Sequence, residues 1–204
     1  MDFYKEPLAP GIVAFHNVLE NPQEFISDLE GLVEINNLAW VAGTTRDVNA
    51  DGSTPNVVTT SIRDVEVISL PNFEKDLNLK AQGGAQVYVH NFLHESLYPV
   101  VTEYAREHGV ISYANGEGWQ LLKYGAGHHF GNHVDDNKMY PRTFSLSYYL
   151  NDDYEGGEIE FPRFGLKIKP VANQLIMFPA NYVYNHIVHP VTSGTRYAVV
   201  NWFE

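Results

Sequence analysis

The residues whose types and spacing could do chemistry lie mainly in the second half of the chain, and His133 and Asp135 are the foremost. They stand two residues apart in His133-Val134-Asp135. Residues i and i+2 of a strand point to the same face, so an imidazole and a carboxylate would converge on one point. Both groups are metal ligands, and a facial iron(II) site uses two histidines and one carboxylate while leaving other coordination positions open. The hypothesis therefore requires a second histidine from a distant strand.

Two histidines near the C-terminus could complete such a site. His186 and His189 are three residues apart, so in an extended strand they face opposite ways and only one can reach the metal. Arg196 follows them, and its planar guanidinium matches a carboxylate bidentately. Because an unpaired buried arginine is costly, a bound anion in its pocket is the easier explanation.

Composition narrows the classes of function. The chain has 204 residues, 44% of them hydrophobic and 13% aromatic, which predicts one folded domain with a packed interior. The absence of cysteine excludes disulfides, a thiolate zinc site and a cysteine nucleophile. A net charge of −12 predicts no nucleic acid or anionic membrane as partner. With no signal peptide pattern or long apolar stretch, we expect a cytoplasmic protein.

The elements that must position these residues are predicted to be helical in the first half. Asn21-Pro22-Gln23-Glu24 is typical of a helix start, with an Asn cap and Pro at the first helical position. A second helix is predicted over about 86–108, ended by Gly109, with Pro99 kinking or splitting it. The polar segment 44–55 is predicted to be a loop, either a substrate lid or a plain connection.

Short β runs broken by turn residues follow Gly118. Eight strands are predicted, at 119–124, 128–134, 143–150, 158–161, 166–169, 174–178, 184–189 and 197–203. Eight short strands after two helices favour a double-sheet jelly roll backed by helices. We therefore expect one α+β, mainly β domain over residues 1–204, with a helical support region over about 1–117. A cupin-like double-stranded β-helix would form the catalytic core over about 118–204.

The second half also resembles the prolyl 4-hydroxylase branch of the 2-oxoglutarate/iron(II) dioxygenases. That branch carries Tyr-x-x-Gly-x-x-aromatic-x-x-His-x-Asp, then Arg, Tyr-Leu-Asn, Gly-Gly, Phe-Pro, His, Pro-Val, Gly-x-Arg and Trp. The residues at those positions are Tyr124, Gly127, Phe130, His133, Asp135, Arg142, Tyr149-Leu150-Asn151, Gly156-Gly157, Phe161-Pro162, His186, Pro190-Val191, Gly194-Thr195-Arg196 and Trp202.

Two positions depart from the branch's commonest pattern. Phe130 stands where many members have Tyr, so one hydroxyl beside the site is absent. Arg196 stands where collagen-type members have Lys, which leans toward the oxygen-sensor and the bacterial or viral hydroxylases. The resemblance covers about residues 119–203 and is thin before Gly118.

The resemblance implies that iron(II) is held by His133, Asp135 and His186, with His186 favoured over His189. It implies 2-oxoglutarate and molecular oxygen as cosubstrates, succinate and CO2 as products, and ascorbate as a supporting reductant. Arg196 would clamp the distal carboxylate of 2-oxoglutarate.

Further residues receive roles around this centre. Tyr124 and Tyr149 would donate phenolic hydrogen bonds to the carboxylate held by Arg196. A substrate-facing role is assigned to Arg142, Arg63, Ile159 and Trp202, and for Arg63 a surface ion pair is an equal alternative.

Three classes of function follow. The first is a hydroxylase of prolyl residues in a peptide or protein, which needs an open groove. The second is a related dioxygenase of a free amino acid or small metabolite, which needs a closed pocket with charged anchors. The third is a cupin-like binding protein without catalysis. Iron-dependent release of succinate separates the third class from the other two.

Overall fold

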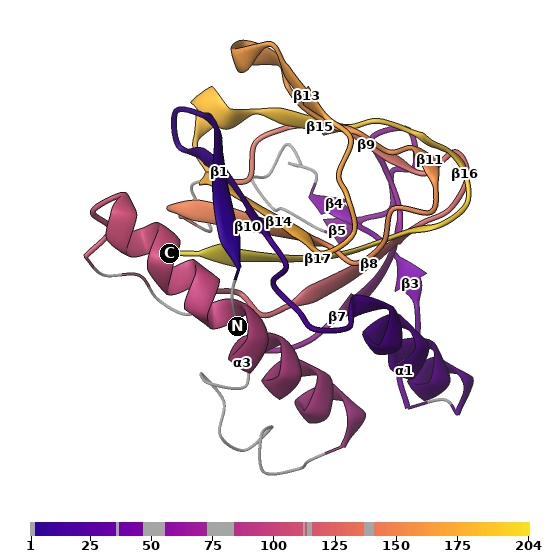
Figure 1. Ribbon diagram of the computed structural model, residues 1–204. Coiled ribbons are helices and arrows are strands. Elements are labelled where there is room, and N and C mark those ends of the chain that lie inside the picture. The colour runs from indigo at the N-terminus through magenta and orange to yellow at the C-terminus, as the bar shows by residue number, and fades with distance from the viewer. Residues whose placement is uncertain are drawn as a thin grey trace.

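A computed structural model of the chain describes residues 3–35, 37–46, 56–72, 84–111, 113, 116–136 and 141–204. Its framework consists of antiparallel sheets with two helices on one side (Figure 1).

The larger sheet, called the major sheet, has eight strands that are antiparallel throughout. In spatial order they are β1 (Tyr4–Ala9), β2 (Ile12–His16), β14 (Gln174–Pro179), β10 (Phe144–Tyr149), β17 (Arg196–Phe203), β8 (Gln120–Tyr124), β7 (Glu66–Ser69) and β3 (Val41–Ala42).

The second sheet, called the minor sheet, has five strands and is also antiparallel. In order they are β13 (Leu166–Ile168), β12 (Ile159–Phe161), β15 (His186–Val188), β9 (His129–His133) and β6 (Arg63–Asp64). Two short ribbons complete the β structure: β11 (Glu155–Gly156) with β16 (Val191–Ser193), and β4 (Thr45–Arg46) with β5 (Asn56–Val57). Two single 3-10 turns cover Pro162–Phe164 and Tyr182–Tyr184. The major and minor sheets enclose a common core. This arrangement of the two sheets is the double-stranded β-helix expected from the sequence.

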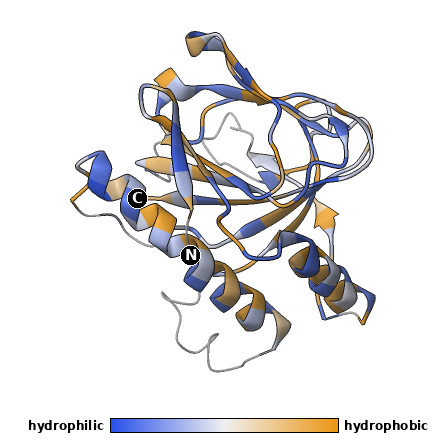
Figure 2. Cartoon of the chain, in the orientation of Figure 1, coloured by the Kyte–Doolittle hydropathy of each residue, from blue (hydrophilic) through white to orange (hydrophobic). Residues whose placement is uncertain are grey.

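The helices α1 (Pro22–Glu34) and α3 (Ala85–Glu107) form where the sequence predicts them. Asn21 caps α1 by accepting a hydrogen bond from the Glu24 amide. Pro99 lies inside α3, which continues through it and is not split. Figure 2 shows hydrophilic and hydrophobic stripes on both helices, and the apolar side packs on the major sheet. Leu97, at 0% exposure, is one of the α3 residues in this contact.

Successive side chains of β10 point alternately into two hydrophobic cores, one against the helices and one between the sheets. Phe144, Leu146 and Tyr148 face the helices, whereas Tyr149 faces the minor sheet. Because successive side chains of a strand point to opposite faces, Ser145 is directed to the minor-sheet side with Tyr149. The space between the sheets therefore receives polar side chains from an otherwise apolar central strand.

The expectation of a helical first half is wrong for part of its residues, which form strands. β1 and β2 form a hairpin that pairs with β14, and β7 pairs with β8, so the first half supplies strands at both sides of the major sheet. These strands satisfy backbone groups that would otherwise lie on open sheet edges. All eight strands predicted after Gly118 are present to within two residues at each end, and the short β11 and β16 were not predicted.

Two further expectations concern the loop at 44–55 and membranes. Residues 47–55 of the loop lie outside the described part of the chain, and its two ends pair as β4 and β5. Neither described helix is long and apolar enough to span a lipid bilayer.

Candidate metal centre and adjoining pocket

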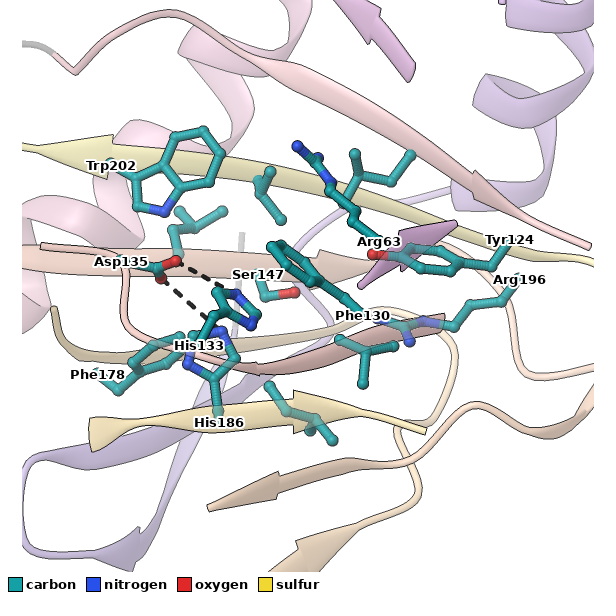
Figure 3. A pocket seen from close by; sticks show the side chains of 15 residues that line it. Arg63, Tyr124, Phe130, His133, Asp135, Ser147, Phe178, His186, Arg196 and Trp202 are labelled. Carbon is teal, nitrogen blue, oxygen red and sulfur yellow. Dashed lines mark ion pairs between the residues drawn. The ribbon is translucent and has the colours of Figure 1, made fainter. Parts of the chain in front are cut away.

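His133, Asp135 and His186 converge on one point between the sheets (Figure 3). His133 at the end of β9 lies directly opposite His186 on β15 in the antiparallel register. The Nε2 atoms of His133 and His186 lie 3.5 and 3.9 Å from the two carboxylate oxygens of Asp135. One ligand atom from each residue lies within 4.8 Å of the others. Asp135 lies two residues past the end of β9, so a turn rather than a strand directs it to the two rings.

Both imidazole rings are oriented by the backbone of their own segments. His133 Nδ1 lies 2.8 Å from the Gly131 carbonyl oxygen, and His186 Nδ1 lies 3.2 Å from that of Tyr184. Since a carbonyl oxygen only accepts, each Nδ1 carries the hydrogen and each Nε2 keeps its lone pair. Those lone pairs belong to the two atoms that approach Asp135.

Buried Asp135 is fixed by two groups that sequence reasoning did not assign to it. Ser145 Oγ donates to Asp135 Oδ2 at 2.7 Å, and Arg142 Nη1 donates to the Asp135 carbonyl at 2.8 Å. The one available signal for Ser145 was a polar residue at an inward position of an apolar strand.

The protonation states suit a divalent cation. Burial opposes ionisation of Asp135, but His186, His133 and Ser145 outweigh it and hold the pKa of Asp135 well below its usual range. Burial, followed by the neighbouring His133, lowers the pKa of His186 to about 4. At neutral pH the cluster thus presents a carboxylate and a neutral His186 ring, which are the forms that bind metals. The donor set therefore fits an iron(II) ion.

His189, the alternative ligand, lies elsewhere. Its Nε2 is 2.6 Å from Glu160 Oε2, and both side chains are partly exposed. Of the two C-terminal histidines, His186 is the one that the structure brings to His133 and Asp135.

A pocket with an empty volume of about 450 Å³, its opening included, lies beside the cluster. Its far end contains Arg196, which is 1% exposed and lies opposite Tyr124 in the β17–β8 register. The guanidinium carbon is 4.7 Å from the centre of the Tyr124 ring and 4.9 Å from that of Tyr149. The three residues predicted to hold a carboxylate are thus neighbours.

Several hydrogen-bonding atoms of Arg196 and of residues near it have no partner among the described residues. They are Arg196 Nε and the hydroxyls of Tyr149 and Tyr154, and Tyr154 was not predicted. Arg196 Nη1 donates only to the Gly157 carbonyl, at 3.1 Å. Buried donors are normally satisfied, so their presence around a buried cation fits the carboxylate of a bound dicarboxylic acid.

The Gly156-Gly157 pair is needed for this arrangement. Both residues have positive φ, 71° and 66°, a region that side chains rarely adopt. A Cβ atom on Gly156 would lie 2.3 Å from the Pro190 carbonyl oxygen. The close approach places the Gly157 carbonyl on Arg196.

Arg142 is engaged within the protein. It makes a bidentate ion pair with Glu117, with both bonds at 2.7 Å, and its guanidinium carbon lies 4.1 Å from the centre of the Trp202 ring. Together with the hydrogen bond to the Asp135 carbonyl, these contacts fix the Arg142 side chain beside the metal cluster. Arg142 also lines a wider groove that borders the cluster.

The remaining predicted residues also line the site. Arg63 and Trp202 border the pocket (Figure 3). Ile159 also lines it and is 2% exposed. The alternative of an ion pair for Arg63 has no support among the described residues, where the guanidinium donates to a backbone carbonyl and a side-chain amide.

A wider groove opens on the other side of the cluster. Its empty volume is about 1410 Å³, and it shares Arg63, Phe130, His133, Asp135 and Trp202 with the inner pocket. The cluster therefore lies where the smaller inner pocket meets the larger outer groove.

Comparisons of sequence relate the second half of the chain to a known family. Residues 119–204 match the sequence model of the 2OG-Fe(II) oxygenase superfamily. The chain is 38% identical over 91 residues to a PKHD-type hydroxylase of a Synechococcus species, a match that covers 40% of each protein. It is 40% identical over 67 residues to human prolyl 3-hydroxylase 2, covering 30% of this chain and 10% of that protein.

Comparisons of structure show the same fold over almost the whole chain. A prolyl hydroxylase from Trichoplax adhaerens, solved with a hypoxia inducible factor peptide fragment, has a TM-score of 0.69 at 17% identity and covers 97% of this chain and 84% of that one. The collagen prolyl hydroxylase of Paramecium Bursaria Chlorella virus-1 has a TM-score of 0.56 at 21% identity, with 95% of both chains covered.

Proposed function

We propose that the protein is an iron(II)- and 2-oxoglutarate-dependent dioxygenase that hydroxylates a C–H bond, with release of succinate and CO2. The observation that carries the proposal is the convergence of His133, Asp135 and His186 beside a pocket that ends in the buried Arg196. One without the other would fit a simple metal site or a simple anion site. Together they agree with the match of residues 119–204 to the 2OG-Fe(II) oxygenase superfamily model.

In this proposal His133, Asp135 and His186 would hold the iron. The bound iron would supply the activation of oxygen and the oxidising power. The chain's own contribution is to fix geometry. The carbonyls of Gly131 and Tyr184 hold the two rings, and Ser145 and Arg142 hold Asp135. Such outer partners orient ligands and raise metal affinity.

Arg196 binds the distal carboxylate of 2-oxoglutarate in the same proposal. Its planar fork suits bidentate binding of a carboxylate, and its charge is permanent. Tyr149 and Tyr124 lie against the guanidinium, and the free hydroxyls of Tyr149 and Tyr154 are available as additional donors. Ile159 and Trp202 line the pocket and would keep bulk water from the reacting centre.

The substrate class proposed is a prolyl residue in a peptide or protein. The outer groove has a larger empty volume than the inner pocket, which leaves room for an extended peptide. Hydroxylases named for prolyl residues also occur among both the sequence relatives and the structures of similar fold. The proposal also includes ascorbate as the supporting reductant and a cytoplasmic location.

The sequence matches cover only part of each relative, so they do not assign the relatives' whole activities to this chain. The chain spans about two fifths of the length of the curated PKHD-type relatives that it matches. Dioxygenation of a free amino acid or small metabolite is therefore the second candidate, and the charge of Arg63 in the groove is the observation that favours it.

The first experiment measures succinate formed from 2-oxoglutarate by the purified protein with added iron(II), ascorbate and proline-containing peptides. Mass spectrometry of the peptides should show a single added oxygen. His186→Ala should remove iron-dependent succinate formation, whereas the matched change His189→Ala should retain it. Succinate formation that survives in both His186→Ala and Asp135→Ala would show that the metal site is not the one proposed.

A further inference from the structure

Two arginines line the outer groove, and they differ in how their charge is balanced. Arg142 is paired bidentately with Glu117. Arg63 makes no ion pair with any carboxylate among the described residues; Nη1 donates to the Thr44 carbonyl at 2.9 Å and Nη2 to the Gln120 side-chain oxygen at 3.3 Å. Both acceptors are neutral, so they hold the guanidinium in place without compensating its charge.

The surroundings of Arg63 increase the effect of that charge. Arg63 on β6 lies opposite Phe130 on β9, and its guanidinium carbon is 5.0 Å from the centre of the Phe130 ring. Its Nε is buried and has no hydrogen-bond partner among the residues that the structure describes. Burial lowers the pKa of Arg63, although Tyr124 and Asp135 oppose this change. A guanidinium in such a position is stabilised by an anion that reaches it from the groove.

The other charged residues that line the two pockets already have partners in the structure or in the proposed function. Asp135 faces the proposed metal, Arg196 the proposed cosubstrate carboxylate, and Arg142 pairs with Glu117. Arg63 is the cation left over among the described lining residues. Because it borders both pockets, it lies where a substrate must pass or rest to reach the metal cluster.

Resting on the proposed function, we infer that Arg63 binds a carboxylate of the substrate close to the carbon that reacts. Phe130 sets the distance, since its ring centre is 5.0 Å from the Arg63 guanidinium carbon and 3.6 Å from the centre of the His133 ring. An extended chain rises about 3.3 Å per residue. The carboxylate is therefore that of the reacting residue itself or the side chain of an acidic residue next to it.

The test uses the full chain loaded with 2-oxoglutarate and with Mn(II) in place of iron(II), so that no turnover occurs. Two pairs of probes matched in shape are compared. N-acetyl-L-proline is compared with N-acetyl-L-prolinamide, and acetyl-Pro-Asp-amide with acetyl-Pro-Asn-amide. The first pair reports a carboxylate on the reacting residue and the second a neighbouring acidic side chain. Dissociation constants are measured by calorimetry at fixed ionic strength. We expect the carboxylate member of one pair to bind about tenfold or more tightly than its neutral partner.

Three variants assign that preference to Arg63. Arg63→Gln should reduce the ratio of affinities to about one, and Arg63→Lys, which keeps the charge, should retain part of it. Arg106→Gln is the matched control, because Arg106 is an exposed α3 residue paired with Glu103 and its loss changes net charge equally. Its ratio should equal that of the unmodified chain.

The outcomes separate the inference from the proposed function. Equal affinity within both pairs, no binding of either carboxylate probe up to millimolar concentration, or a preference that persists in Arg63→Gln would each overturn the role of Arg63. Titration of 2-oxoglutarate into the Mn(II)-loaded chain, before the probes are added, tests the proposed function on the same protein preparation. If that titration shows binding while the probe pairs show no preference, the inference alone fails.

Discussion

The hydrogen bond from Ser145 to Asp135 offers a direct test of how the candidate metal centre is held. The donor is 1% exposed and the carboxylate 7%, and their oxygens are 2.7 Å apart. Ser145→Ala removes one hydroxyl and leaves Asp135 in place. The carboxylate then loses the contact that holds it toward the two imidazoles.

The size of the effect follows from the geometry. A hydrogen bond to a charged group contributes about 1.5–3 kcal/mol, and loss of an outer partner of a metal ligand typically weakens metal binding by about 10–100-fold. Because the bond also exists without metal, part of its free energy is lost from the metal-free fold. We therefore expect metal affinity to fall about tenfold and the free energy of unfolding of the metal-free protein to fall by about 1 kcal/mol or more.

The assay is competition for Mn(II) between the protein and a chelator of known affinity, beside urea denaturation of the metal-free protein. Ser147→Ala is the control, since Ser147 lies two residues along the same face of β10 and lines the pocket. Ser147→Ala should leave metal affinity within about twofold of that of the unmodified chain, because the proposed metal ligands and the partners that hold them stay in place. An equal loss in both variants, or none in Ser145→Ala, would refute the reasoning.

Three other expectations follow from the structure. Arg196→Ala should raise the dissociation constant of 2-oxoglutarate by about 100-fold or more while metal affinity changes little, measured by separate titrations; parallel losses would contradict its role. Leu97→Ala should lower the free energy of unfolding in urea by about 2–5 kcal/mol, because Leu97 is fully buried against the major sheet. Mn(II) at 100 times its dissociation constant should stabilise the chain by about 2.7 kcal/mol and leave Asp135→Ala unchanged.

The convergence of residues from distant segments was predictable from the sequence because their spacing follows a known pattern. The spacing from Tyr124 to Trp202 matched one family pattern throughout, and the structure brings His133, Asp135 and His186 together as that pattern implies. Preference for His186 over His189 also agrees with the geometry, since His189 pairs with Glu160.

Contacts between residues with no shared pattern could not be predicted. Ser145 lies ten positions from Asp135 and Glu117 lies 25 from Arg142, and no local spacing relates them. The strands of the first half were missed because β1 is an exposed edge strand that contains Pro7, and β7 is only four residues long. Such strands form through their neighbours' unpaired backbone groups more than through their own pattern.

One feature of β17 has a wider consequence for how this chain tolerates change. Arg196 and Trp202 lie on the same strand, six residues apart, and both line the inner pocket. Deleting a single residue inside β17 would turn every following side chain to the opposite face, moving Trp202 away from Arg142 while Arg196 stayed. The length of this strand thus links the two ends of the site, and insertions or deletions should be accommodated in the turn before Arg196 and not within the strand.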